Sequence, residues 1–241
     1  MAKAVKWADQ RNSWHYPSLA EKAMKSLERN NFSTHYCGTK DEAKAAILGM
    51  IPEGCSVGWG GSVTLYNMGI LYDICSSGKY ECHNPFQGFV SDDQPYLAET
   101  VRNLEGRKRM RELMRASLLV DVYLASTNAI TLEGELVNID GMGNRVAAML
   151  FGPWKVIVVA GANKIVSNMD AAMDRIKTMA APMTAKMLGH HTPCATVGTC
   201  VPAKGGHCLH PHRICCGTVT INGQYDKDRI HVVIVGEDLG F

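Results

Sequence analysis

The sequence contains no long hydrophobic run. Its apolar stretches, such as Leu118–Ala125 and Lys155–Ala160, are far shorter than the roughly 18 consecutive apolar residues that a membrane-spanning helix needs. The first 20 residues also lack the apolar centre of a secretory signal. We therefore expect no membrane span and a cytoplasmic location.

The chain also lacks an excess of charge of one sign. Its 25 Lys and Arg residues against 23 Asp and Glu residues give a formal net charge of +2, which argues against a nucleic-acid partner. Hydrophobic residues make up 46% of the chain, enough to bury a core. Because no repeat or low-complexity linker interrupts the sequence, we expect one domain over residues 1–241, with an N-terminal helical segment over about residues 1–32.

Helical and strand patterns alternate along the chain. Buried strands separated by helices of about ten to fifteen residues predict an α/β fold with a mostly parallel sheet flanked by helices. A further alternating stretch, Ala129–Ile139, predicts a hairpin. Thr39 and Glu42 form a capping-box signature at the start of a helix that ends before Pro52. The other predicted strands are Ser33–Cys37, Cys55–Gly58, Leu118–Ser126, Val156–Ala160 and Ile230–Val235, and the other predicted helices are Pro17–Asn30, Leu65–Leu71, Asp93–Ala116, Asn144–Phe151 and Asn168–Met179.

A glycine-rich turn follows the second predicted strand. Gly60, Gly61, Ser62 and Thr64 would expose backbone N–H groups and hydroxyls at the start of a helix, which predicts a site for a small carboxylate or phosphorylated ligand. The turn has neither the Gly-Lys-Ser/Thr ending of a Walker A loop nor the glycine spacing of a dinucleotide fingerprint. A tight turn capped by Ser62 would need the same glycines, so the structural interpretation stays open beside the functional one.

Polar residues also follow the strand that ends near Ser126. Asn128 could orient a carbonyl, Asp140 could accept a proton, and Arg145 could pair with a carboxylate or phosphate. Ligands of open α/β sheets bind beyond the carboxyl ends of the strands, where we expect this segment and the glycine-rich turn to meet. Asp140 could instead cap the following helix.

Four segments together resemble the LUD-domain family of lactate-utilisation proteins: Gly60–Leu65, Ala125–Thr131, Gly134–Ala148 and Gly152–Val166. The resemblance covers nearly the whole chain. It implies a fold related to the ribose-phosphate isomerase, glucosamine-phosphate deaminase and CoA-transferase superfamily, whose first glycine-rich turn holds a phosphate, carboxylate or acyl group. The catalytic Asp and Lys of the isomerases and the catalytic Glu of the CoA-transferases have no counterpart that we can place, so whether the protein is an enzyme stays undecided.

Five of the nine cysteines lie with five histidines in a Cys/His-rich insertion over about residues 190–216, which we expect just before the last strand. In a cytosolic protein such cysteines favour metal ligands, reactive thiols or buried core positions over disulfides. Cys194, Cys200, Cys208 and Cys215 have a spacing that suits zinc or an iron–sulfur cluster, although Cys216 could replace Cys215. The remaining cysteines are expected to be small buried core residues, namely Cys37, Cys55, Cys75 and Cys82.

The cysteine segment also resembles a family motif, with a longer gap between its second and third cysteines and with His210 and Cys216 in place of Ser and Asn. The resemblance implies a 4Fe-4S cluster, with zinc as the alternative. It also implies an electron-transfer or accessory role beside iron–sulfur or dehydrogenase subunits in the oxidation of lactate or a similar small hydroxy acid. Two other functions stay open: a stand-alone enzyme or binding protein for an anionic or acyl ligand, and a non-catalytic scaffold. The protein could also form a homo-oligomer.

Overall fold

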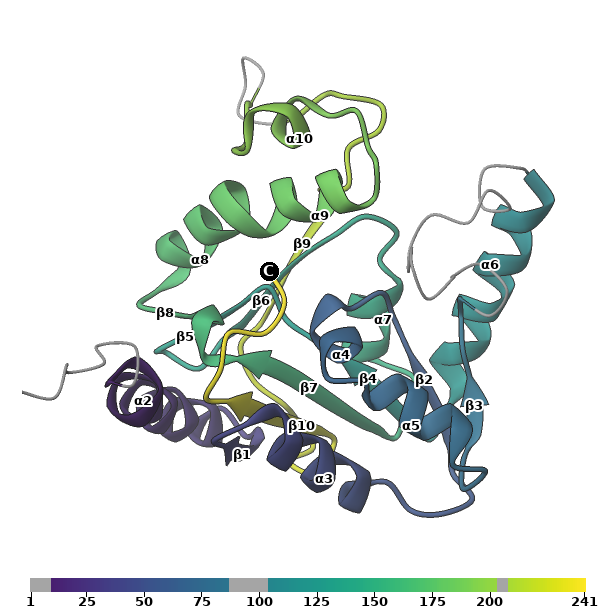
Figure 1. Cartoon of the computed structure of the whole chain (residues 1–241), viewed down its shortest axis with the longest axis vertical. Helices are drawn as coiled ribbons and strands as arrows, with labels where there is room; N and C mark the ends of the chain where they lie inside the picture. Colours follow the sequence, from purple (N-terminus) through teal and green to yellow (C-terminus); the bar gives the residue numbers. More distant parts are fainter. Residues whose placement is uncertain (1–9, 87–103, 203–207) are drawn as a thin grey trace, which may run out of the picture.

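The computed structural model describes residues 10–86, 104–202 and 208–241. Six parallel strands form the main sheet in the order β1-β10-β7-β4-β2-β3. This arrangement confirms the predicted α/β fold with a mostly parallel sheet flanked by helices (Figure 1). The strands are β1 (Ser33–Cys37), β2 (Ser56–Trp59), β3 (Glu81–His83), β4 (Val122–Ala125), β7 (Lys155–Gly161) and β10 (Ile230–Val235).

Helices cover both faces of this sheet because the central strands are apolar on both sides. Along β7, Val156 and Val158 pack with α2 (Tyr16–Arg29) and α7 (Asn144–Leu150) in one buried cluster. The alternate residues, Ile157 and Val159, pack with α3 (Lys40–Met50), α4 (Val63–Asn67) and α5 (Ile70–Ser76) in a second cluster. The two-residue period of a strand therefore divides the core between the two faces.

A second sheet of four strands stands beside the first. Its order is β8 (Ile165–Val166), β5 (Ala129–Thr131), β6 (Leu136–Asp140) and β9 (Gly217–Ile221). Strands β5 and β6 form the predicted antiparallel hairpin. Strand β9 is not among the strands predicted from the sequence. The cysteine segment, expected just before the last strand, leads instead into β9 of the second sheet, and β10 follows later.

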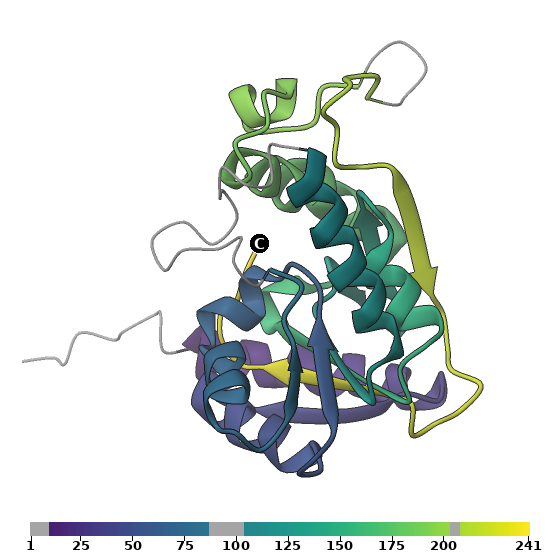
Figure 2. The ribbon, with the colours of Figure 1, turned by 90° about the vertical axis from the view of Figure 1, so that its right-hand side faces the viewer.

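The helices not named above are α6 (Leu104–Ala116), α8 (Met169–Arg175), α9 (Ala181–Met187), α10 (Pro193–Val197) and the short helical turns η1 (Arg11–His15), η3 (Ser117–Leu119), η4 (Ala162–Lys164) and η5 (Ile176–Ala180). These remaining helices divide between the two sheets, since η3 contacts β2 of the main sheet and α8 contacts β5 and β8 of the second. In both Figure 1 and Figure 2, α8, α9 and α10 lie together at the top, away from the main sheet. No helix among the described residues is long and apolar enough to cross a membrane.

Local sequence signals explain several boundaries. The capping box is present, since Thr39 Oγ1 accepts from the Glu42 backbone N–H over 3.2 Å and the Glu42 side chain accepts from the Thr39 N–H. The single helix predicted over Leu65–Leu71 is wrong, because Gly69 has a positive φ of 67° and separates α4 from α5.

One other expectation needs correction, and a further one is described only in part. The strand predicted from Leu118 begins only at Val122, because η3 precedes it. The helix predicted over Asp93–Ala116 is described from Leu104, and its earlier part lies outside the described residues.

The four isolated cysteines divide into two groups. Cys37 is buried as expected, and Cys55 is half-buried. Cys75 and Cys82 form a disulfide between α5 and β3, so the expectation of two buried core thiols is wrong there. A spacing of seven residues across a helix end and a strand start lets two Cα atoms approach to 5.5 Å, within the range that a disulfide bridges.

Candidate functional site

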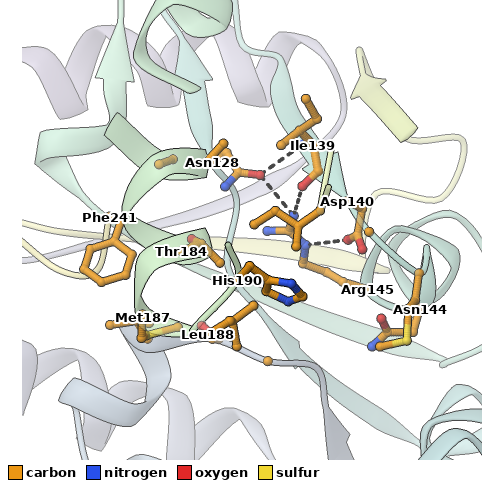
Figure 3. Close-up of a pocket in the computed structure, with 18 of the residues that line it drawn as sticks. Asn128, Ile139, Asp140, Asn144, Arg145, Thr184, Met187, Leu188, His190 and Phe241 are labelled. Atoms are coloured by element: carbon orange, nitrogen blue, oxygen red, sulfur yellow. Dashed lines mark hydrogen bonds and ion pairs between the residues drawn. The ribbon is translucent and has the colours of Figure 1, made fainter. Parts of the chain in front are cut away.

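A cavity of about 910 Å³ lies where the main sheet meets the second sheet. Its floor comes from residues that directly follow three neighbouring strands, β2, β4 and β7. As predicted, the glycine-rich turn and the segment around Asn128, Asp140 and Arg145 line one cavity, although Asp140 ends β6 of the second sheet and not a strand of the main sheet. Figure 3 shows Asn128, Asp140 and Arg145 together on one side of this cavity. Helices α6 and α9, the cysteine segment and Phe241 complete the lining.

Gly60 does not line this cavity. A Cβ at this position would lie 2.8 Å from the Tyr123 hydroxyl and 3.5 Å from Arg145 Cβ. Gly60 therefore allows β4 and α7 to pack beneath the turn. Its expected part in holding a ligand has no geometric support among the residues that line the cavity.

Gly61, Ser62 and Thr64 do line the cavity. Ser62 Oγ accepts from the Leu65 backbone N–H over 3.3 Å and so caps α4, as the structural interpretation of the turn predicts. Thr64 is 1% exposed, and its Oγ1 hydrogen-bonds to Ser126 Oγ over 3.2 Å. The Thr64 hydroxyl is therefore part of a buried network, whereas the Ser62 hydroxyl caps a helix.

Arg145 holds the neighbouring loop together. Its guanidinium donates to Asp140 Oδ2 over 3.0 Å, to Asn128 Oδ1 over 3.0 Å, and to the carbonyls of Ser126 and Ile139 (Figure 3). Four of the five N–H donors of the guanidinium are thus engaged. Asp140 also accepts from the Gly143 N–H. The geometry supports a structural role for this pair, and proton transfer by Asp140 stays a prediction.

Lys164 is the site residue that sequence reasoning missed. It follows β7 at the end of η4, is 3% exposed and lines the cavity. Its Nζ donates to Thr64 Oγ1 over 2.8 Å, to Ser126 Oγ over 3.0 Å and to the Thr127 carbonyl over 3.3 Å. Within the described residues, no carboxylate contacts this amine.

The surroundings of Lys164 disfavour its charged form. Burial lowers the pKa of the amine well below its ordinary value, and the positive charges of Arg175 and Arg145 lower it further. Arg175 is itself buried, donates to the carbonyls of Asn128 and Asn163, and keeps Nη2 without a hydrogen-bond partner in the described structure. The sequence does contain a signal that Lys164 is buried, because this lysine lies directly before the apolar pair Ile165 and Val166 and close after an apolar strand.

The lining of the cavity carries an excess of positive charge. Its described side chains include one carboxylate, that of Asp140, which is already paired with Arg145. Four lining residues are Lys or Arg, namely Arg107, Arg145, Lys164 and Arg213. Three histidines and several methionine side chains add polar and apolar surface. Such a lining favours an organic ligand with negative charge.

The cysteine segment borders the same cavity. His212, Arg213 and Ile214 line it, and the Cys216 N–H donates to the Asp140 carbonyl over 2.9 Å, where β9 pairs with β6. None of the four predicted metal-binding cysteines lines the cavity. The two candidate sites are therefore adjacent but separate.

The thiols of Cys194, Cys200, Cys208 and Cys215 are free. Burial, together with the nearby thiols of the other three cysteines and of Cys216, raises the pKa of the Cys215 thiol to about 11, which places the four sulfurs in one electrostatic neighbourhood. Over residues 10–86, 104–202 and 208–241, no three His, Cys, Asp or Glu side chains form a ready metal site. The donor chemistry suits a soft metal, and the longer gap between Cys200 and Cys208 lies largely outside the described residues.

Two comparisons with known proteins bear on this fold. The family model of the LUD domain matches residues 20–235. A crystal structure of a DUF162 family protein from Deinococcus radiodurans is similar with a TM-score of 0.50 and 11% sequence identity, over 91% of this chain and 98% of that one. A search of the curated proteins finds no match. At this identity the structural likeness concerns the fold alone.

Proposed function

We propose, from the premise that this chain belongs to the LUD-domain family, that it binds a small organic anion in the cavity and takes part in the oxidation of lactate or a similar hydroxy acid. One observation supports the anion site above all others. Among the described side chains that line the cavity, the one carboxylate, Asp140, is already paired with Arg145. Arg107 and Arg213 form no ion pair within the described structure, so the lining stays positively charged even with Lys164 as a neutral amine. A bound carboxylate or phosphate would offset this charge.

Two exposed arginines provide the test, because their replacement costs the core nothing. Arg107 and Arg213 line the cavity, whereas Arg111 lies one turn further along the same helix as Arg107 and does not. By calorimetry we expect saturable binding of lactate or pyruvate, with about three- to tenfold weaker binding for Arg107→Gln and Arg213→Gln. Arg111→Gln should bind as the wild type does. Equal binding of lactate and its uncharged amide would contradict the proposal.

The second candidate function is metal binding by the cysteine segment. It is favoured by four free thiols that influence one another, those of Cys215 and of the three other predicted ligands. Cys194, Cys200, Cys208 and Cys215 would hold a 4Fe-4S cluster, with zinc as the alternative occupant. A bound cluster would supply one-electron transfer toward a dehydrogenase or another iron–sulfur subunit. Four thiolates would saturate its irons, so we place the relay of electrons, and not substrate binding, at this site.

Metal content tests the second function. After anaerobic purification we expect iron and sulfide, visible absorbance that dithionite bleaches, and a sharp loss of metal in each single Cys→Ser variant of the four ligands. Cys216→Ser and Cys55→Ser serve as controls, since one is the adjacent thiol and the other lies on the main sheet side of the protein. Colourless protein with stoichiometric zinc would favour the structural alternative. Unchanged metal in two of the four variants would contradict the ligand set.

A further inference from the structure

We propose that Lys164 is a nucleophilic amine that forms an imine with the carbonyl carbon of a small 2-oxo acid bound in the cavity. This inference rests on the proposed function, because it requires an organic acid in the same cavity. It deepens that function by naming the class of the acid and the atom that reacts with it.

The partners of Lys164 distinguish it from the ion-paired lysines of the chain. Lys25, Lys44 and Lys79 each form an ion pair with a carboxylate. Lys164 Nζ instead contacts two hydroxyls and one carbonyl, and within the described structure no acidic side chain balances it. An amine held in this way lies ready at the cavity floor without a counter-ion that would keep it protonated.

The charge state required for nucleophilic attack agrees with this geometry. Burial and the two nearby guanidinium groups, Arg175 on α8 and Arg145 on α7, lower the pKa of the amine. The deprotonated amine has a lone pair, which an ammonium lacks. The hydroxyls of Thr64 and Ser126 can donate as well as accept, so they can hydrogen-bond to either form of the amine.

The cavity also fits the second functional group of a 2-oxo acid. Asn128 follows Thr127, whose carbonyl accepts from Lys164, and the Asn128 Nδ2 donor has no protein partner in the described part of the chain. This amide and the positively charged lining can hold the carboxylate while the oxo carbon lies at Nζ. Oxidation of a 2-hydroxy acid yields a 2-oxo acid, so the ligand class agrees with the proposed reaction.

The reaction balances without an added reagent. The Nζ lone pair attacks the oxo carbon and a C–N bond forms, while the C=O π electrons move to the oxygen. The two amine protons pass to that oxygen, and the chain of hydroxyls at Ser126 and Thr64 offers a route for them. Water leaves, and a C=N bond remains between Lys164 and the former oxo carbon.

Reductive trapping tests this inference on the full-length protein. Pyruvate is added near neutral pH with cyanoborohydride, and the modified peptides are identified by mass spectrometry. We expect the reduced adduct on the peptide that contains Lys164, at least about tenfold more than on peptides with exposed lysines, because a lysine amine in water is protonated near neutral pH. Lactate, which has no carbonyl, should give no adduct.

Variants provide the matched controls. Lys164→Met should lose the adduct, whereas Lys155→Met, at the opposite end of β7, should keep it. Because the adduct is mapped in the wild-type protein, the test does not depend on the folding of Lys164→Met. Saturable pyruvate binding with no adduct at Lys164 would overturn the imine and leave the anion site standing. Absence of both binding and adduct would overturn the imine and the proposed function together.

Discussion

Lys164 and Thr64 join two segments 100 residues apart, through a hydrogen bond of 2.8 Å from Nζ to Oγ1. Strands β7 and β2, which precede these residues, are not neighbours, because β4 lies between them. Ser126, at the end of β4, hydrogen-bonds to both side chains. One buried network therefore ties together the carboxyl ends of three adjacent strands at the floor of the cavity.

Replacement of Lys164 by Met should change how stability depends on pH. The unfolded chain holds the lysine proton up to about its ordinary pKa of 10.5, whereas the folded chain releases it at lower pH. Between these two pKa values the unfolded state binds more protons, so the free energy of unfolding of the wild type rises with pH, by up to about 1.4 kcal/mol per unit. Urea unfolding at several pH values should show that Lys164→Met lacks this rise. Parallel curves for the two proteins would contradict it.

Gly240→Ala should disturb the same network from the other side. Gly240 has a φ of +64°, and a Cβ there would overlap Thr64 Oγ1 and lie 3.2 Å from Lys164 Nζ. We expect a loss of about 2–3 kcal/mol in the free energy of unfolding. Gly78→Ala is the control, since its φ is +69° but no atom lies within 4 Å of the added Cβ. If the two variants lose equal stability, the overlap of the added Cβ with the Thr64 side chain contributes nothing to the loss.

The Asp140–Arg145 pair should contribute to stability as a unit. Their side chains are 10% and 15% exposed, so removal of one partner leaves a largely buried charge without its counter-ion. Asp140→Ala and Arg145→Met should each cost about 3 kcal/mol, and the double variant should cost clearly less than their sum. Urea unfolding of the four proteins in a double-mutant cycle measures this coupling. Strict additivity would show that the two side chains act independently.

The Cys75–Cys82 disulfide should be detectable by thiol counting. In denaturant without reductant we expect seven reactive thiols, the number of free cysteines in the structure, and nine after reduction. The double variant Cys75→Ser, Cys82→Ser should lose about 2–3 kcal/mol of stability, because the unfolded chain is no longer closed into a short loop. Cys55→Ser in an otherwise intact chain is the control. Nine thiols before reduction would contradict the disulfide.

Local signals predicted much of the fold. The strand Ile230–Val235 forms as predicted from its β-branched, apolar run. The strand Ser33–Cys37 also forms as predicted, from a short polar run that tolerates a β conformation. Thr39 and Glu42 identified a helix start because both halves of a capping box are local. The meeting of the glycine-rich turn with Asn128 and Arg145 followed from the general position of sites at the carboxyl ends of parallel strands.

The parts that sequence did not predict depend on contacts between distant residues. Nothing local shows that Lys164 is buried beside Thr64, since its partners come from two other strand ends. Strand β9 forms because Val219 and Thr220 pair with β6, and an isolated five-residue segment does not show this pairing. The disulfide of Cys75 depends on the return of the chain along β3, a strand of three residues.

The order of the main sheet also determines when it can assemble during synthesis. Within the described residues, β1 pairs with β10 alone, and β10 lies between β1 and β7. Residues 33–37 leave the ribosome first, but their partner strand follows almost 200 residues later, as residues 230–235 emerge. Until then β1 has an unpaired edge, and contacts so far apart along the chain slow folding. We therefore expect the sheet to close only after translation of β10, so that nascent chains depend on chaperones to protect this edge.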